Sequence, residues 1–463
     1  MIVVEAFAGR RVAVLGLART GLAAARSLAA GGADVLAWDD DAAVRDAVAG
    51  DVRLCDPAEW GRIAALVLSP GIPHSFPAPH PAVARARAEG ADIIGDIELL
   101  GRAQPDATLV AITGTNGKST TTALIGHILA AAGRRVEIGG NLGTPVLALA
   151  PLGNGEAYVL EASSFQLELV TTLAFDVAVL LNITPDHLDR HGGMDGYVAA
   201  KRRIFARRRG AATAIVGLDD PICRDIASGL RRAGAAGVVP IATTRPAPGG
   251  VYVDRDGVLL DATGEVPVPV LALGEAERLP GRHNWQNAAA AYAAVRRLGV
   301  PADAAARAIR SFRGLAHRQE LVATIDGVRF INDSKATNAD AAEKALACYQ
   351  PIYWIAGGLP KAGGITSLTP CFGRLRHACL IGAATEEFAA TLADAVPVTR
   401  CRDLAAAVAT AAERARRDAV PGAVVLLSPA CASYDQFANF EARGDAFRAL
   451  VRDLADRREA ARQ

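Results

Sequence analysis

Two glycines, a lysine and several hydroxyl side chains follow an apolar run in the stretch Val110–Thr122, which reads VAITGTNGKSTTT. This pattern predicts a strand, a tight turn and a helix. Gly114 and Gly117 would let successive backbone N–H groups converge on an anion, and the helix would add its positive N-terminal end. Lys118 could then reach the outer phosphates of a nucleotide, and a hydroxyl could bind Mg²⁺. The residues expected at the phosphates are Gly114, Thr115, Asn116, Gly117, Lys118, Ser119 and Thr120.

The usual phosphate-loop pattern also requires a glycine at position 112, where this chain has Ile112. The glycine-lysine-hydroxyl part of the pattern is nevertheless complete. The alternative interpretation is an ordinary glycine turn between a strand and a helix, with a lysine on the surface.

Two polar side chains follow predicted strands farther along the chain. Glu161 ends the apolar run Tyr158–Glu161, where ligands of open α/β sheets gather, and is a candidate Mg²⁺ ligand; the alternative is a solvated loop carboxylate. His187 lies in NITPDHLDRH, whose two histidines have helical spacing. A zinc site of the HExxH type would need glutamate where Leu188 stands, so we interpret His187 as a phosphate or metal contact, or else as a hydrogen-bonded loop histidine.

Two helices carry further candidates. The stretch 197–209 is expected to form a basic amphipathic helix whose arginines face solvent, while Lys201 could turn toward the sheet and the nucleotide. Asn284 and Asn287 are three residues apart, as a helix needs to place two carboxamides beside a base edge, although Asn284 could instead be a helix N-cap. The cluster 332–338 (NDSKATN) places an acid, a cation and hydroxyls after a strand, where a ribose or carboxylate could bind.

Composition favours small-molecule ligands. Lys plus Arg number 50 and Asp plus Glu 49, so the charge gives no reason to expect nucleic acid or an anionic membrane as main partner. The seven cysteines are scattered and form no CxxC, which disfavours both a disulfide framework and a structural zinc site. Without a signal peptide or a long uncharged apolar stretch, we expect a cytoplasmic protein that is neither exported nor membrane-spanning.

The order of apolar runs predicts an α/β fold with three domains, which the length of 463 residues also favours. Residues 1–105 would form an N-terminal Rossmann-like domain, although Ala18 replaces the middle glycine of GxGxxG. Residues 106–315 would form a central P-loop ATPase-type parallel sheet, interrupted by a β-rich stretch at 238–273. Residues 316–463 would form a C-terminal Rossmann-like α/β domain.

Six motifs together with the phosphate loop resemble the Mur ligase family, which shares that loop with folylpolyglutamate synthetases. They are LEASSFQLE (160–168), NITPDHLDRH (182–191), AAKRRIF (199–205), GRHNWQN (281–287), NDSKATN (332–338) and LSPACASYDQFANFEARG (427–444). The resemblance spans essentially the whole chain, and the last two motifs favour the members that add D-glutamate. One position departs from the pattern, because Leu359 stands where many relatives have aspartate, two residues before Lys361.

The resemblance implies ATP-dependent amide synthesis in peptidoglycan precursor assembly, through an acyl phosphate. D-Glutamate would be joined to UDP-N-acetylmuramoyl-L-alanine (UDP-MurNAc-L-Ala) by a monomeric cytoplasmic enzyme that binds neither nucleic acid nor membrane. It implies that Lys118, Glu161, His187 and Lys201 are catalytic. Ser119 and Glu161 would hold one Mg²⁺, and His187 with a carbamylated Lys201 a second.

The remaining matched residues divide by ligand. Asn284 and Asn287 would face adenine, with Arg318 and Asp333 on the phosphate and ribose side. The D-glutamate pocket would contain Lys335, Thr337, Lys361, Ser433 and Phe440. Asn141 would touch the muramoyl group, and the UDP moiety would contact Leu17, Ala18, Arg19, Thr20, Asp39, Ser69, Pro70 and Gly71.

Alternatives remain at this point. Another Mur ligase or a folylpolyglutamate synthetase would share the chemistry. An NAD-dependent oxidoreductase could be built on residues 11–40, against which Ala18 and the phosphate loop argue. A non-catalytic nucleotide-gated binding module is the third possibility.

Overall fold

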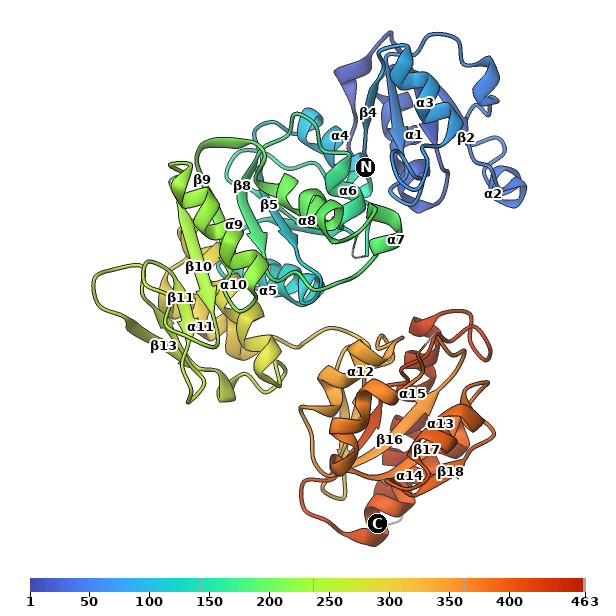
Figure 1. Cartoon of the computed structure of the whole chain (residues 1–463), viewed down its shortest axis with the longest axis vertical. Helices are drawn as coiled ribbons and strands as arrows, with labels where there is room; N and C mark the ends of the chain where they lie inside the picture. The colour runs from blue at the N-terminus through green and yellow to red at the C-terminus, as the bar shows by residue number, and fades with distance from the viewer. Residues whose placement is uncertain (142, 236, 362, 461–463) are drawn as a thin grey trace. The chain divides into compact units, whose positions relative to one another are not determined.

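The computed structural model describes residues 1–141, 143–235, 237–361 and 363–460. The chain divides into two compact units, Met1–Glu275 with Asn284–Ser311, and Ala276–His283 with Phe312–Gln463. Three sheets, dominated by parallel strands and flanked by helices, confirm the predicted α/β class (Figure 1). The domain limits at residues 105 and 315 stay predictions.

The N-terminal sheet contains four parallel strands in the order β2-β1-β3-β4. Its apolar runs are buried, as expected of parallel strands covered on both faces. The strands are β1 (Arg11–Leu15), β2 (Asp34–Trp38), β3 (Ala65–Leu68) and β4 (Asp92–Ile94). The helices are α1 (Arg19–Ala30), α2 (Ala42–Ala47) and α3 (Pro81–Ala88), with 3-10 turns η1 (Glu5–Phe7) and η2 (Pro57–Glu59).

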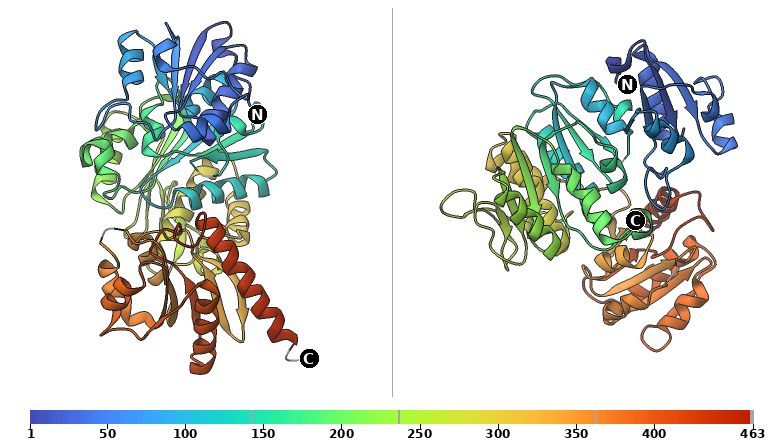
Figure 2. Two further views of the ribbon diagram at one scale, coloured as in Figure 1. Left: turned by 90° about the vertical axis from the view of Figure 1, so that its right-hand side faces the viewer. Right: turned by 45° about the horizontal axis from the view of Figure 1, so that its top comes forward.

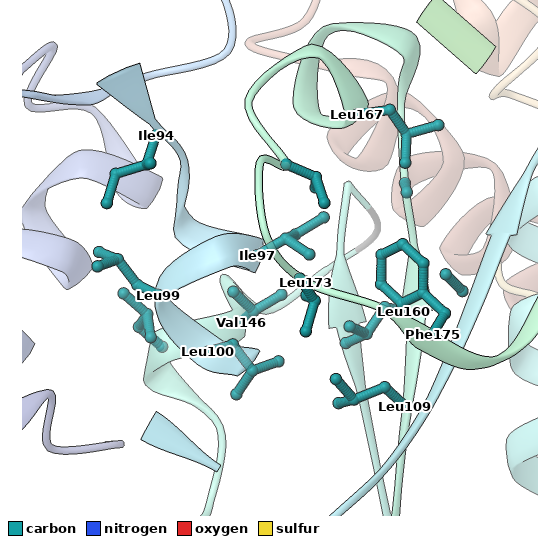
Figure 3. Close-up of a cluster of buried hydrophobic side chains, with 14 of the residues drawn as sticks. Ile94, Ile97, Leu99, Leu100, Leu109, Val146, Leu160, Leu167, Leu173 and Phe175 are labelled. Carbon is teal, nitrogen blue, oxygen red and sulfur yellow. The ribbon is translucent and has the colours of Figure 1, made fainter. Parts of the chain in front are cut away.

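Helix α4 (Asp96–Ala103) joins this sheet to the next, and its apolar face is part of one continuous core. Figure 3 shows Ile97 and Leu100 of α4 among Val146, Leu160 and Leu173. Gly101 is needed here because a Cβ at this position would lie 2.2 Å from Leu173 Cδ1.

The central sheet contains nine strands in the order β13-β12-β11-β10-β9-β8-β5-β7-β6. The β-rich stretch therefore extends this sheet at one edge. Its strands are β5 (Thr108–Thr113), β6 (Val136–Gly140), β7 (Ala157–Glu161), β8 (Phe175–Leu180), β9 (Arg208–Gly217), β10 (Val238–Ala242), β11 (Val251–Val253), β12 (Val258–Asp261) and β13 (Val268–Ala272). The helices are α5 (Lys118–Ala131), α6 (Ser164–Glu168), α7 (Leu188–His191), α8 (Met194–Arg202), α9 (Pro221–Arg232), α10 (Arg282–Arg297) and α11 (Ala302–Ser311), with 3-10 turns η3 (Val146–Ala148), η4 (Arg203–Phe205) and η5 (Leu273–Glu275).

The second unit contains a six-stranded sheet in the order β14-β15-β19-β16-β17-β18, parallel except for β14. Figure 2 shows its long last helix, α15, leading to the end of the chain. The strands are β14 (Glu320–Ile325), β15 (Val328–Asn332), β16 (Ile352–Gly357), β17 (Leu375–Ile381), β18 (Val398–Arg400) and β19 (Val424–Leu427). The helices are α12 (Ala339–Leu346), α13 (Thr385–Leu392), α14 (Leu404–Asp418) and α15 (Phe440–Ala460), with the 3-10 segment η6 (Thr366–Arg374).

A helix that spans a bilayer needs about 20 predominantly apolar residues. Within the described residues, no helix is both long enough and apolar enough to cross a membrane.

Candidate active site

The predicted phosphate loop joins β5 to α5. Gly114 and Gly117 have φ angles of 154° and 87°, a region of backbone conformation that favours glycine. Helix α5 begins at Lys118, so its positive end faces the loop. Lys118 Nζ donates to the carbonyls of Gly114 and Thr115, both at 2.9 Å. The loop therefore has the backbone and the cation that a phosphate group requires.

Asn182, which follows the neighbouring strand β8, holds this loop. Its Oδ1 accepts from Asn116 N at 2.9 Å, and its Nδ2 donates to Asn116 O at 3.2 Å and to Gln286 Oε1 at 2.9 Å. Gln286 Nε2 in turn donates to Asp219 Oδ2 at 3.0 Å. Sequence reasoning did not single out Asn182, Gln286 or Asp219; the available signal was that Asn182 and Asp219 each follow a strand of the sheet.

Asn284 and Asn287 are both buried behind the loop. Asn287 Nδ2 donates to Asn284 Oδ1 at 2.9 Å, and Asn287 Oδ1 accepts from Thr121 Oγ1 at 3.2 Å. A Cβ on Gly117 would lie 2.2 Å from Asn287 Oδ1, so this carboxamide lies directly against the loop. The N-cap interpretation of Asn284 is wrong, because α10 already begins at Arg282.

Glu161 lies at the carboxyl end of β7, beside β5 in the parallel sheet. Its side chain is buried, and Oε1 accepts from Asn141 Nδ2 at 2.7 Å. Its Oε2 is buried without a hydrogen-bond partner. An unpartnered carboxylate oxygen in this position is an available ligand for a cation, because burying it without one is costly.

Lys201 is 1% exposed, and its Nζ donates to Gly114 O at 2.9 Å. Burial, assisted by the nearby charge of Lys118, lowers the pKa of Lys201 from 10.5 to about 7. The lysine therefore lies at the phosphate loop and has access to its neutral form near neutral pH.

His187 precedes α7, with a positive φ of 50° and a side chain that is 52% exposed. Its Nε2 lies 3.4 Å from Asp186 Oδ2, and its ring centroid is 5.0 Å from that of Phe165. The histidine has room to accept a further partner.

The predicted basic helix over 197–209 is too long. Helix α8 ends at Arg202, the 3-10 turn η4 follows, and Arg208 and Arg209 belong to strand β9. The strand continues the sheet beside β8, so pairing with a neighbour outweighs the helical preference of an arginine run.

The residues predicted for UDP lie where β1, β2 and β3 end. Leu17 N donates to Asp39 Oδ2 at 2.6 Å, and Ser69 Oγ donates to Gly16 O at 2.8 Å. Ala18 is the N-cap of α1, without a side-chain cap, and Arg19 donates to Gly143 O. Thr20, Pro70 and Gly71 are half-buried or exposed beside them. The three strand ends therefore form one polar edge.

Glu168 connects this N-terminal region to the His187 segment, and sequence reasoning missed it. Its carboxylate lies 2.9 Å from His74 Nε2, 3.0 Å from His191 Nδ1 and 3.6 Å from Arg190 NH1. Arg190 also donates to the carbonyls of Ile72 and Phe76. These partners lower the pKa of the Glu168 carboxyl against the opposing effect of its burial.

Asp333 lies after β15 in the second unit and is buried. Its Oδ2 accepts from Ser428 Oγ at 2.8 Å, and its Oδ1 accepts from Gln319 N at 3.1 Å. Burial raises its pKa from 3.8 to about 7. Gln319 and His317 both have positive φ, so Asp333 helps to hold a strained turn around Arg318.

Four of the five residues predicted for D-glutamate lie on three loops of the second unit, and the fifth, Phe440, begins helix α15. Lys335 Nζ is 5.4 Å from the ring centroid of Phe440, the first residue of α15. Thr337 is half-buried, Ser433 is buried and Lys361 is exposed. Leu359, which replaces an acid of the family pattern, pairs through its backbone with Ala432, and its side chain is 43% exposed.

A family model described as Mur ligase middle domain matches residues 112–295, and one described as Mur ligase, glutamate ligase domain matches residues 317–431. Similar proteins named UDP-N-acetylmuramoylalanine–D-glutamate ligase include one from Rhodospirillum rubrum, 56% identical over 98% of this chain and 97% of its own. A second, from Phenylobacterium zucineum, is 55% identical over 98% of this chain and 99% of its own.

Two solved structures share the fold. UDP-N-acetylmuramate-alanine ligase MurC from Thermotoga maritima has a TM-score of 0.58 at 15% identity, over 96% of this chain and 99% of its own. MurF ligase from Thermotoga maritima in complex with ADP has a TM-score of 0.55 at 18% identity, over 86% and 97%. The full-length sequence relatives confirm the resemblance inferred from the motifs: the chain belongs to the Mur ligase family.

Proposed function

We propose that this protein is an ATP-dependent amide-bond ligase that adds D-glutamate to UDP-MurNAc-L-Ala in peptidoglycan precursor synthesis. The observation that carries the proposal is the phosphate loop with Lys118 at its helix, beside the unpartnered carboxylate oxygen of Glu161. Full-length relatives at 55–56% identity that carry this ligase name support the choice of substrates.

The residues present fit ATP and Mg²⁺. The positive-φ glycines leave backbone room at the loop, and the orphaned Oε2 of Glu161 offers a hard oxygen ligand. Ser119 would hold Mg²⁺ together with Glu161, and His187 and Lys201 would hold or orient a second ion. Bound Mg²⁺ would neutralise negative charge on the phosphates.

Asn284 and Asn287 are proposed near adenine, and Arg318 and Asp333 near phosphate and ribose. Because Asn287 and Asp333 are hydrogen-bonded to protein groups, we propose that they act largely by positioning their loops.

The proposed reaction has two steps. A carboxylate oxygen of UDP-MurNAc-L-Ala attacks the γ-phosphorus, and the bond from this phosphorus to the oxygen that bridges it to ADP breaks. ADP is released, and UDP-MurNAc-L-Ala now carries the phosphoryl group as an acyl phosphate. The neutral amine of D-glutamate then attacks the acyl carbon and releases its proton to water, and the tetrahedral intermediate expels phosphate. Lys118 would stabilise the charge on the phosphoryl group during transfer, mainly through position and electrostatics.

Lys201 is proposed to act as its carbamate. Its neutral amine would attack CO₂, form an N–C bond and lose a proton, so that a cation becomes an anion suited to Mg²⁺. The lowered pKa of Lys201 supports this step, because only the neutral amine reacts.

The UDP site is proposed at the polar edge formed by the N-terminal strand ends, and the D-glutamate site at the loops of the second unit. UDP would contact the ends of β1, β2 and β3, and Asn141 would touch the muramoyl group. D-Glutamate would bind Lys335, Thr337, Lys361, Ser433 and Phe440. We also propose a monomer working in the cytoplasm; the unpaired state of all seven cysteines is compatible with a reducing compartment.

The test is release of phosphate from ATP with UDP-MurNAc-L-Ala and a panel of amino acids. D-Glutamate should support turnover, and L-glutamate, diaminopimelate and L-lysine should not. Turnover with another amino acid would overturn the named specificity, and absence of amino-acid-dependent phosphate release would overturn the ligase proposal.

A further inference from the structure

Arg443 is a buried arginine in the first turn of α15, and its side chain has no assigned task in the proposed reaction. It is 1% exposed, and among the described residues it forms no ion pair within 4 Å, although the Asp435 carboxylate acts on its charge from a greater distance. Burial lowers its pKa from 12.5 to about 10, so the side chain still carries its charge at neutral pH. A buried cation without a carboxylate partner is uncommon and needs a reason.

The hydrogen bonds of Arg443 reach two separate loops. Nε donates to Ser334 Oγ at 3.0 Å, and NH2 donates to Ser334 O at 2.9 Å. NH2 also donates to Cys431 O at 3.2 Å, and NH1 donates to Ala432 O at 3.3 Å. The planar guanidinium thus holds the 334 loop and the 431–432 loop at a fixed separation, which a lysine with its single nitrogen could not reproduce.

Two more segments lie against this network, one through Ser334 and one beside the guanidinium itself. Ser334 Oγ donates to Phe440 O at 2.8 Å, which links the first loop to the start of α15. Gly358, with φ of 132°, approaches so closely that a Cβ there would lie 3.2 Å from Arg443 NH1 and 2.3 Å from Ala432 O. Gly358 opens the loop that carries Lys361.

Each segment that meets Arg443 or Ser334 therefore carries a residue proposed for the amino acid. Ser334 precedes Lys335, Ala432 precedes Ser433, Phe440 begins α15, and Gly358 opens the loop to Lys361. We infer that Arg443 is a positioning residue that sets the spacing of the amino-acid pocket, and that its charge favours a dicarboxylate bound there. This inference rests on the proposed D-glutamate ligase function for the identity of the amino acid.

The experiment compares Arg443→Lys and Arg443→Met with the wild-type chain in steady-state kinetics. Because hydrogen bonds from a charged group are lost, the Michaelis constant for D-glutamate should rise about tenfold in the lysine variant and more in the methionine variant. The constants for ATP and the UDP substrate should stay within about twofold, as for unrelated substitutions.

Two controls separate positioning from general destabilisation. Arg452→Met removes an exposed arginine from the same helix, and Val451→Ala removes a buried methyl pair from the core under it. Neither should raise the constant for D-glutamate, even where Val451→Ala lowers the melting temperature as much as the Arg443 variants do. An equal rise in Val451→Ala, or no rise in either Arg443 variant, would overturn the inference.

Amide hydrogen exchange provides a measurement that does not depend on the reaction. In the Arg443 variants, backbone amides in 333–338 and 430–436 should exchange faster than in the wild type, while those in β16 and β17 should be unchanged. Protection of both loops equal to that in the wild type would contradict the inference. A wild-type chain that joins another amino acid would refute the proposed specificity alone. The positioning role of Arg443 would then be tested by the effect of its variants on the Michaelis constant for that amino acid.

Discussion

Replacing Gly117 by alanine tests how the phosphate loop is built. The residue has φ of 87°, and an added Cβ would lie 2.2 Å from Asn287 Oδ1 and 3.1 Å from Leu181 Cδ1. Asn287 cannot easily move away, because it is buried and hydrogen-bonded to Thr121 and Asn284. The loop must therefore shift, and its N–H groups should lose their common direction.

The expected magnitude follows from two contributions. A left-handed conformation costs an alanine about 1–2 kcal/mol. Loss of the bond between Thr121 and Asn287 adds about 1 kcal/mol, for a total of about 2–3 kcal/mol. Misdirected N–H groups should also weaken ADP binding at least about tenfold, which corresponds to about 1.4 kcal/mol.

Gly133→Ala is the matched control, because Gly133 follows the same helix with φ of 75° and has nothing within 4 Å of an added Cβ. Urea unfolding should show a loss of about 1–2 kcal/mol for this variant, from backbone strain alone. Calorimetric titration with ADP and Mg²⁺ should show unchanged affinity. If Gly117→Ala also bound ADP like the wild type, the collision with Asn287 would not control the loop and the reasoning would be refuted.

Four further outcomes are expected. Lys118→Ala should lower turnover by about three orders of magnitude without unfolding the chain, since it removes a phosphate-neutralising cation; near-normal phosphate release by the folded variant would contradict its role. Lys201→Ala should be partly rescued by short carboxylates and wild-type activity should fall when CO₂ is depleted, whereas unchanged activity without CO₂ would exclude the carbamate. The Asp333 carboxyl has a pKa of about 7 in the folded state against 3.8 ordinarily, so the stability it contributes is complete below pH 4 and is lost as pH rises through 7. In Asp333→Asn, the free energy of unfolding measured in urea should therefore depend less on pH between 4 and 7 than in the wild type. Glu168→Gln should weaken calorimetric binding of the UDP substrate more than that of ADP, because Glu168 joins the Ile72–Phe76 loop to Arg190, while Glu156→Gln, at an ion pair with Arg135, should change neither.

Local sequence patterns predicted much of the fold, and they also predicted the phosphate loop and Glu161 of the site. The apolar run, glycines and lysine of the phosphate loop are contiguous, and Glu161 directly ends a strand, so periodicity placed them. Edge strands β14 and β18 were missed because edge strands are only partly buried and carry a weaker apolar pattern. The arginine run was extended into a helix because its strand conformation is imposed by pairing with β8.

Contacts between distant residues could not be predicted from spacing. The bond between Asn182 and Gln286 joins residues 104 apart, and Arg443 reaches across 109 positions to Ser334. Neither partner shows by its own type that it will be buried beside the other. Motif resemblance identified the segments, and the geometry identified which side chains hold them together.

Transfer of isotope from the acceptor to phosphate tests the central claim most directly. UDP-MurNAc-L-Ala labelled with ¹⁸O at both carboxylate oxygens should be incubated with ATP, Mg²⁺ and D-glutamate, and the released phosphate analysed by mass spectrometry. Attack of the carboxylate on the γ-phosphorus predicts one ¹⁸O atom in each phosphate formed with ligated product. Unlabelled phosphate, formed together with ligated product, would contradict the acyl-phosphate route and the role assigned to the phosphate loop.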